Sequence, residues 1–100
     1  MSKIGNFLKH EGKVYIYCAD RETGERFLKD AQGEGFLFSD GAKPTERHSS
    51  DIFALNGDRT INYVGFAGRV AFQCANSVSG RRLVRVDYGK YLEGHNGFIM

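Results

Sequence analysis

Short runs of apolar and β-prone residues recur along the chain and predict five strands. These are residues 14–18, 36–38, 51–55, 59–64 and 83–88. In the first run, tyrosines on one face alternate with Val and Ile on the other, so both faces are partly apolar. This pattern is typical of a strand inside a sheet, because an edge or surface strand usually has one polar face.

A helix is predicted between the first two strands, over residues 20–32. Asp20 stands where an N-cap residue is expected, and its carboxylate suits the positive end of the helix dipole. Phe27, Leu28 and Ala31 fall on one stripe, which we expect to be buried. The glycines that follow the helix are typical of a left-handed helix stop.

The clearest local signal is Asn56-Gly57, which lies between two β-prone runs. Asn-Gly favours a two-residue type I′ turn, because both of its residues readily adopt positive φ. An antiparallel hairpin is therefore predicted around this pair.

Residues 66–75 allow two interpretations. Phe66, Val70 and Cys74 share one face of a helix, whereas Val70, Phe72 and Cys74 alternate as in a strand. Turn-forming residues bracket about three helical turns here, which favours a short helix.

The two ends of the chain are less strongly patterned. Residues 1–12 predict a short N-terminal helix with Ser2 as its cap. Residues 93–100 form a glycine-rich tail with an apolar end. This tail either hangs loose or docks, and it would dock on this domain or on a partner.

Together these elements predict one small α+β domain over residues 1–100. We expect a mixed sheet of four or five strands with a β-α-β start, a hairpin, and one or two helices on one face.

Composition restricts the function only broadly. The chain has 100 residues, of which 41% are hydrophobic and 26% are charged, as is usual for a globular protein. Its net charge of +2 is too small to indicate nucleic-acid binding by itself. No apolar run approaches the length of about 18 residues that a membrane helix needs, and the first residues do not form a signal peptide. We therefore expect a cytoplasmic protein that does not enter a membrane.

The cysteines, Cys18 and Cys74, lie in apolar runs and do not form a C-x-x-C pair. We interpret both as reduced, buried thiols of a cytosolic protein, with a disulfide between them as the alternative. A low-pKa nucleophile is not expected in such surroundings.

No catalytic or metal-binding motif stands out. The histidines, at positions 10, 48 and 95, are far apart, so that no zinc-ligand spacing exists. No glycine-rich phosphate loop occurs either. The sequence therefore predicts no cofactor, no metal and no enzyme activity. The alternative is a nuclease in which His48 acts with Asp51 or Glu46, while Lys43 or Arg47 holds a phosphate.

Candidate binding residues fall into two groups. The polar loop 42–50 carries the first group, and loops of this kind often carry function. A mild basic cluster towards the C-terminus forms the second group and has Tyr63, Tyr88 or Tyr91 near it as partners for base stacking. The candidates are Lys43, Arg47 and His48 in the loop, and Arg69, Arg81, Arg82 and Arg85 in the cluster.

The order of elements resembles a class of short uncharacterised proteins that phages and prophages encode. The residues that carry the resemblance are Phe7-Leu8-Lys9, the run at 13–18, Phe27-Leu28 in the capped helix, Gly35-Phe36, and the closing Asp87-Tyr88. The resemblance covers roughly residues 4 to 92. The chain departs from the pattern in its 42–50 loop, which lacks the Trp often found there, and in its glycine-rich tail.

The resemblance implies a small accessory protein of a mobile element. Such proteins often bind a host component: they block a defence nuclease, sequester a nucleotide signal or redirect host machinery. We therefore expect a protein that occludes a host protein or nucleoprotein complex in the bacterial cytoplasm, in particular as an inhibitor of a CRISPR-type defence system. The alternative is a binder of a phosphate-bearing ligand, such as a nucleotide signal, or of nucleic acid. A homodimer is compatible with either function.

Overall fold

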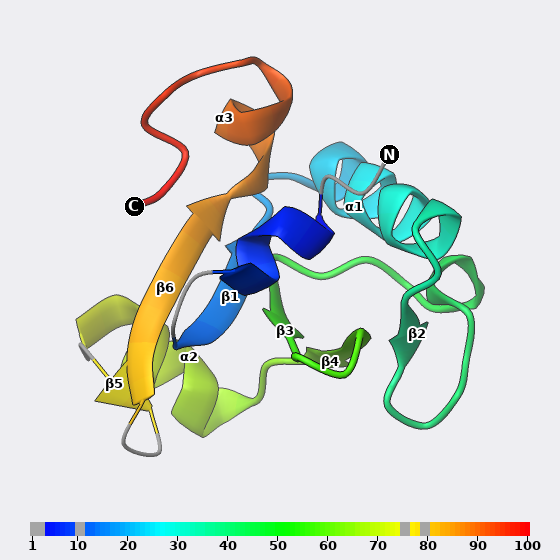
Figure 1. Ribbon diagram of the computed structural model, residues 1–100, viewed down its shortest axis with the longest axis horizontal. Helices are drawn as coiled ribbons and strands as arrows, with labels where there is room; N and C mark the ends of the chain where they lie inside the picture. Colours follow the sequence, from blue (N-terminus) through cyan, green and yellow to red (C-terminus); the bar gives the residue numbers. More distant parts are fainter. Residues whose placement is uncertain (1–3, 10–11, 75–76, 79–80) are drawn as a thin grey trace.

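The structure is a computed structural model that describes residues 4–9, 12–74, 77–78 and 81–100 (Figure 1). The helices are α1 (Arg21–Gly33), α2 (Phe66–Cys74) and α3 (Tyr88–Leu92), with the 3-10 helices η1 (Gly5–Lys9) and η2 (Pro44–Glu46). The strands are β1 (Lys13–Tyr17), β2 (Leu37–Phe38), β3 (Ile52–Leu55), β4 (Thr60–Tyr63), β5 (Ser77–Val78) and β6 (Arg81–Asp87).

The strands form one mixed sheet in the order β2-β4-β3-β1-β6-β5. Strand β1 lies inside the sheet, parallel to β6 and antiparallel to β3, and β2 runs parallel to β4. The predicted α+β class and mixed sheet are confirmed, because five strands form the body of the sheet and the two-residue β5 extends one edge. Strands β1 and β2, which flank α1 in the sequence, are separated by β3 and β4 in the sheet.

Side chains of β1 alternate between two cores. Val14 and Ile16 belong to the larger core under α1, and Tyr15 belongs to a smaller core against α2. Successive residues of a strand point to opposite faces, so the two helices cover opposite faces of the sheet. Figure 1 shows α1 and α2 far apart, with strands between them. The expectation that a second helix would lie beside the first is wrong.

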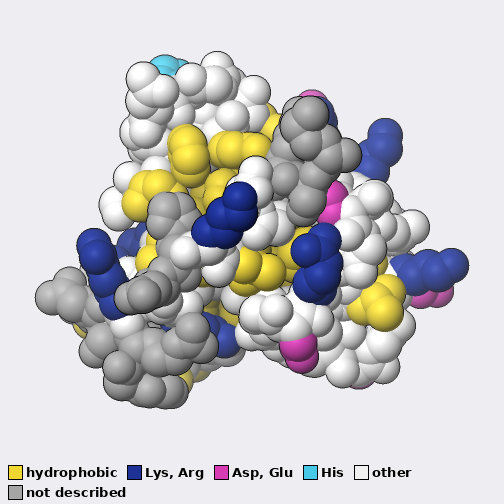
Figure 2. Space-filling view, viewed as in Figure 1, with side chains coloured by type: hydrophobic (Ala, Val, Ile, Leu, Met, Phe, Trp, Pro, Cys, Tyr) yellow, Lys and Arg dark blue, Asp and Glu magenta, His cyan; other side chains and the backbone are white. Residues whose placement is uncertain are grey.

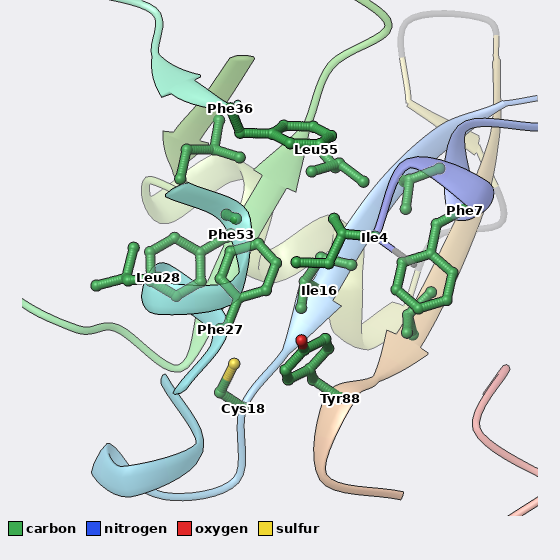
Figure 3. Close-up of a cluster of buried hydrophobic side chains, with 14 of the residues drawn as sticks. Ile4, Phe7, Ile16, Cys18, Phe27, Leu28, Phe36, Phe53, Leu55 and Tyr88 are labelled. Atoms are coloured by element: carbon green, nitrogen blue, oxygen red, sulfur yellow. The ribbon is translucent and has the colours of Figure 1, made fainter. Parts of the chain in front are cut away.

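The larger core is rich in aromatic rings (Figure 3). Phe27 of α1 packs on Phe53 of β3 and on Tyr88, with ring centroids 4.9 and 5.3 Å apart. The Tyr88 hydroxyl donates a hydrogen bond of 2.5 Å to Asp30 Oδ2 on α1. This bond gives a buried hydroxyl its partner and ties the start of α3, directly after β6, to α1.

Helix α1 begins as its sequence predicts, and Gly35 supplies the expected left-handed stop, whereas Gly33 is the last residue of the helix. The Asp20 side chain accepts a hydrogen bond of 2.7 Å from the Thr23 amide, and Gly35 beyond the helix has a φ of 85°. Phe27, Leu28 and Ala31 are buried, as expected. The carboxylate of Glu34 accepts hydrogen bonds from the Ile4 and Gly5 amides at the start of η1. A short N-terminal helical turn therefore exists, while the expected Ser2 cap lies outside the described residues.

The hairpin of β3 and β4 is confirmed, but its predicted type I′ turn is wrong. The Asn56 amide donates to Thr60 O and the Arg59 amide donates to Asn56 O, which makes a three-residue loop. Arg59, with a φ of 67°, takes the left-handed conformation. Its guanidinium donates to Glu34 O at 2.7 Å and lies over the Phe36 ring. These contacts with the end of α1 favour the left-handed conformation at Arg59, whereas the local pattern would assign that conformation to Gly57.

Helix α2 forms as favoured, but it buries a different face from the expected one. Phe72 packs under the helix, stacked on Tyr15 and Tyr17. A Cβ atom at Gly68 would lie 2.5 Å from Val64 Cγ1, so Gly68 allows the helix to approach the sheet closely. Phe66 and Cys74 are exposed, so the prediction that Cys74 is a buried thiol is wrong.

The C-terminal segment docks on its own domain. The Asp87 amide donates to Phe98 O and the Met100 amide donates to Arg85 O, so the segment covers part of the β6 edge. The Phe98 ring packs on Phe7 and Tyr91. Figure 2 shows hydrophobic side chains gathered beside α3 and this segment and running on to the middle of the same face.

Strand β6 ends one residue earlier than expected, because Tyr88 begins α3. Asp87 caps α3 through a hydrogen bond from the Lys90 amide. None of the helices in the described ranges has the length and apolar character that crossing a membrane requires.

Candidate functional site

A cleft of about 650 Å³ opens between the start of α1 and the chain from Thr45 to Asp51. Its volume is within the usual range of ligand pockets, about 300–1,000 Å³. The lining residues come from the end of β1, the first two turns of α1 and the polar loop: Cys18, Ala19, Asp20, Arg21, Glu25, Leu28, Thr45, Arg47, His48, Ser49, Ser50 and Asp51.

Gly24 brings the two walls of the cleft together. It is buried, and a Cβ atom there would lie 2.9 Å from Ser50 O and 3.0 Å from Ser49 Cβ. The loop therefore crosses α1 at the one position of that turn that has no side chain. Elsewhere the Thr45 hydroxyl and amide donate to Gln32 Oε1, at 2.6 and 3.0 Å, which ties the far end of the loop to α1.

Cys18 lies at the floor of the cleft, where its amide donates to Asp51 O at 2.6 Å. In Figure 3 its sulfur lies close to Phe27 and Tyr88. Burial, helped by the negative charges of Asp87, Asp20 and Asp51, raises the pKa of its thiol to about 12. The thiol therefore stays protonated at neutral pH and is no nucleophile.

Arg47 and His48 are the predicted binding residues that the structure places at this cleft. Arg47 forms an ion pair of 2.6 Å with Asp40 and lies over the Phe38 ring. The His48 ring stacks on Tyr63, with centroids 4.8 Å apart, and its Nδ1 lies 3.0 Å from Ser49 O. Both side chains are therefore held by contacts within the domain.

The acid–base pair of the alternative nuclease interpretation does not form in this arrangement. Asp51 also lines the cleft, but its two carboxylate oxygens accept hydrogen bonds of 2.6 and 2.8 Å from Arg69. These bonds lower the pKa of Asp51. Within the described ranges, His48 makes no hydrogen bond to Asp51 or Glu46. Lys43 is exposed, and its amide donates to Glu46 Oε1 at the start of η2.

The C-terminal basic cluster is divided between different partners. Arg69 belongs to the Asp51 pair at the edge of the cleft. The Arg85 guanidinium donates to Phe72 O and Ala71 O, at 2.6 and 3.2 Å, and so caps the end of α2. Arg82 is exposed, and the Arg81 side chain lies outside what the structure describes.

Sequence reasoning missed Asp20, Glu25 and Leu28 as lining residues, because it assigned Asp20 to the helix cap and Leu28 to the core. A signal was present, since Arg21, Glu25 and Leu28 recur at helical spacing and share one face of α1. No three His, Cys, Asp or Glu side chains of the described residues lie close enough together to hold a metal ion.

A second surface lies on α2. Phe66 is 85% exposed and Val70, one turn later, is 45% exposed. Both lie on the outward face of α2, and we call these two residues, with Ala67, the α2 face. The Arg69–Asp51 pair joins this helix to the edge of the cleft. The structure therefore links α2 to the edge of the cleft through this ion pair.

These features define a small α+β domain with an open cleft and an exposed apolar helix face. In comparisons with known proteins, no family model, no curated protein and no solved structure matches this chain. The likeness to phage-encoded proteins therefore rests on the sequence pattern alone and stays a prediction.

Proposed function

We propose that this protein is a small binding protein that occludes a host macromolecule by forming a stoichiometric complex. Exposure of Phe66 on the α2 face is the observation that carries the proposal. Aromatic residues are enriched among the residues that dominate interface energies, and Val70 next to Phe66 extends the apolar contact. A partner that covers the α2 face removes this apolar surface from water.

The contacts at the cleft support binding rather than catalysis. Arg47 and Arg69 are held by Asp40 and Asp51, and His48 is stacked on Tyr63. Such side chains are fixed in place, as a preorganised binding surface requires. The sequence pattern favours an accessory protein of a phage, acting in the bacterial cytoplasm on a host protein or nucleoprotein complex. Inhibition of a CRISPR-type defence system is the particular case that we propose.

Binding of a phosphate-bearing ligand or of nucleic acid is the alternative. It has less support, because Arg69 and Arg85 use their guanidinium groups within the domain. Phosphate-backbone binding would also fall steeply with salt concentration, through counterion release.

The experiment is an affinity pull-down of the tagged protein from bacterial lysate, with and without nuclease treatment, followed by mass spectrometry. We expect one dominant protein partner that survives nuclease treatment and moderate salt. Loss of every partner after nuclease treatment would overturn the proposal in favour of nucleic acid. Turnover of a substrate by substoichiometric amounts of the protein would overturn it in favour of an enzyme.

A further inference from the structure

The cleft beside α1 has an apolar floor and a charged edge. Ala19 contributes exposed apolar surface, Leu28 and Cys18 line the cleft as almost fully buried side chains, and the Cys18 thiol is protonated. The polar residues lie around this floor, on α1 and on the loop. Such a site suits a ligand group with an aliphatic stem and a polar end, because the two parts meet matching surfaces.

The charges at the edge of the cleft determine which charge the polar end of a ligand must carry. Of the lining residues, Arg47 is neutralised by Asp40 and Asp51 is neutralised by Arg69, and neither partner lines the cleft. Three charged side chains then remain, which are the carboxylates of Asp20 and Glu25 and the guanidinium of Arg21.

These three side chains leave an excess of negative charge. Arg21 lies 3.8 Å from Glu25 and both are largely exposed, so this ion pair is loose. Asp20 accepts a hydrogen bond from the Thr23 amide, which leaves its charge in place. Burial is the main cause of the raised pKa of the Cys18 thiol, and the negative charges of Asp87, Asp20 and Asp51 raise this pKa further.

We propose that the cleft is a socket for a lysine or arginine side chain of the partner protein, whose stem lies on Leu28 and Ala19 and whose cation meets Asp20 and Glu25. This inference rests on the proposed function and names the chemistry of the partner. The Arg69–Asp51 ion pair links the edge of the cleft to α2, the helix that carries the exposed Phe66.

The test is an NMR titration of the isotope-labelled protein with the blocked peptides acetyl-Gly-Lys-Gly-amide and acetyl-Gly-Arg-Gly-amide. We expect saturable shifts of the amides of Ala19, Glu25, Leu28 and Ser50. Peptides with norleucine or glutamate at the central position keep a comparable stem and lose or reverse the charge. We expect them to bind more weakly by about fivefold or more, as for loss of an ion pair and its hydrogen bonds.

Variants locate the binding. Asp20→Asn keeps the cap acceptor while removing the charge, and Glu25→Gln keeps the shape of the side chain. We expect each to weaken binding of the lysine peptide about two- to fivefold, as for an exposed ion pair. Glu22→Gln is the matched control, because Glu22 lies in the same turn of α1 but does not line the cleft. We expect this control to bind as the wild type does.

The socket is overturned if the glutamate peptide shifts the same amides as strongly, if the lysine peptide shifts none of them, or if Asp20→Asn and Glu25→Gln bind unchanged. These results are independent of the pull-down. A stable protein complex without peptide binding would leave the proposed function standing and reject the socket. Peptide binding without a protein complex would support the socket and reject the proposed function.

Discussion

At the scale of single residues, Gly24 fits its position better than Ala would, although Gly is the weaker helix former. In an exposed helix, replacing Gly by Ala stabilises by about 1 kcal/mol. At Gly24 the added Cβ atom would lie 2.9 Å from Ser50 O, which is backbone and cannot swing away. We expect Gly24→Ala to lower the free energy of unfolding by about 1–3 kcal/mol, as overpacking does, when measured by urea denaturation.

Gly33, in the last turn of the same helix, is the matched control. A Cβ atom there meets nothing within 4 Å. We expect Gly33→Ala to raise the free energy of unfolding by about 0.5–1 kcal/mol. Equal effects of the two substitutions would contradict the close approach of the loop to α1 at Gly24.

The two cysteines should differ sharply in reactivity. Cys18 is fully buried and its pKa is raised, whereas Cys74 is exposed at the end of α2. We expect a thiol reagent such as DTNB, at about pH 8, to label Cys74 in the folded protein and to label Cys18 only after unfolding. Rapid labelling of both thiols in the native state would contradict the packing of the cleft floor.

The raised pKa of Cys18 also predicts a dependence of stability on pH. Its folded pKa of about 12 lies above its ordinary value of 9.0, so the unfolded chain loses this proton first as pH rises. The stabilising contribution is therefore complete below about pH 9 and is lost between about pH 9 and 12. We expect unfolding free energy to fall more steeply in this range for the wild type than for Cys18→Ala, by up to about 1.4 kcal/mol per pH unit. Equal slopes of unfolding free energy against pH in the two proteins would contradict the raised pKa of Cys18.

Local chemistry explains which single positions the sequence could predict. Asp20 caps α1 because its partner, the Thr23 amide, lies three residues away. Arg59 takes its left-handed conformation because of Glu34 and Phe36, which are more than twenty residues away. Contacts of the first kind can be predicted from a sequence, and contacts of the second kind depend on the fold.

At the scale of elements, the C-terminal segment acts as a cover for β6. Phe98 packs between Phe7 and Tyr91, and its carbonyl accepts the Asp87 amide. We expect Phe98→Ala to lower the free energy of unfolding by about 2 kcal/mol, less than for a fully buried Phe. Hydrogen exchange at the Asp87 amide should also become faster. Met100→Ala is the control, since Met100 is 55% exposed, and we expect little change. An unchanged exchange rate in Phe98→Ala would contradict the docking.

Helix α2 marks the limit of sequence periodicity. The pattern correctly favoured a helix but placed Phe66, Val70 and Cys74 on the buried face. The helix instead packs through Gly68 and Phe72, because the absent side chain at Gly68 allows close contact with Val64. Counting apolar residues favours the face with more of them, so the exposed α2 face could not be predicted.

At the scale of the whole molecule, the class of fold could be predicted and the arrangement could not. Strand positions follow from local pattern, but β2 pairs with β4 and β1 pairs with β6 through contacts between distant parts of the chain. The cleft depends on the same arrangement, because α1 and the loop at Ser49 meet only in the folded domain. The loop residues Arg47 and His48 were therefore predicted as candidates, but their neighbours Asp20 and Glu25 were not.

The most direct test of the binding function compares Phe66→Ser with Leu37→Ser in complex formation. Both residues are exposed and apolar, but Leu37 lies on β2, and it is 42% exposed. The measurement is the amount of the nuclease-resistant partner that each tagged variant recovers, with folding checked by circular dichroism. We predict that the Leu37→Ser protein recovers as much partner as the wild type and that the Phe66→Ser protein recovers at most about a tenth, as for loss of an interface hot spot. Equal recovery by the two folded variants would contradict the account.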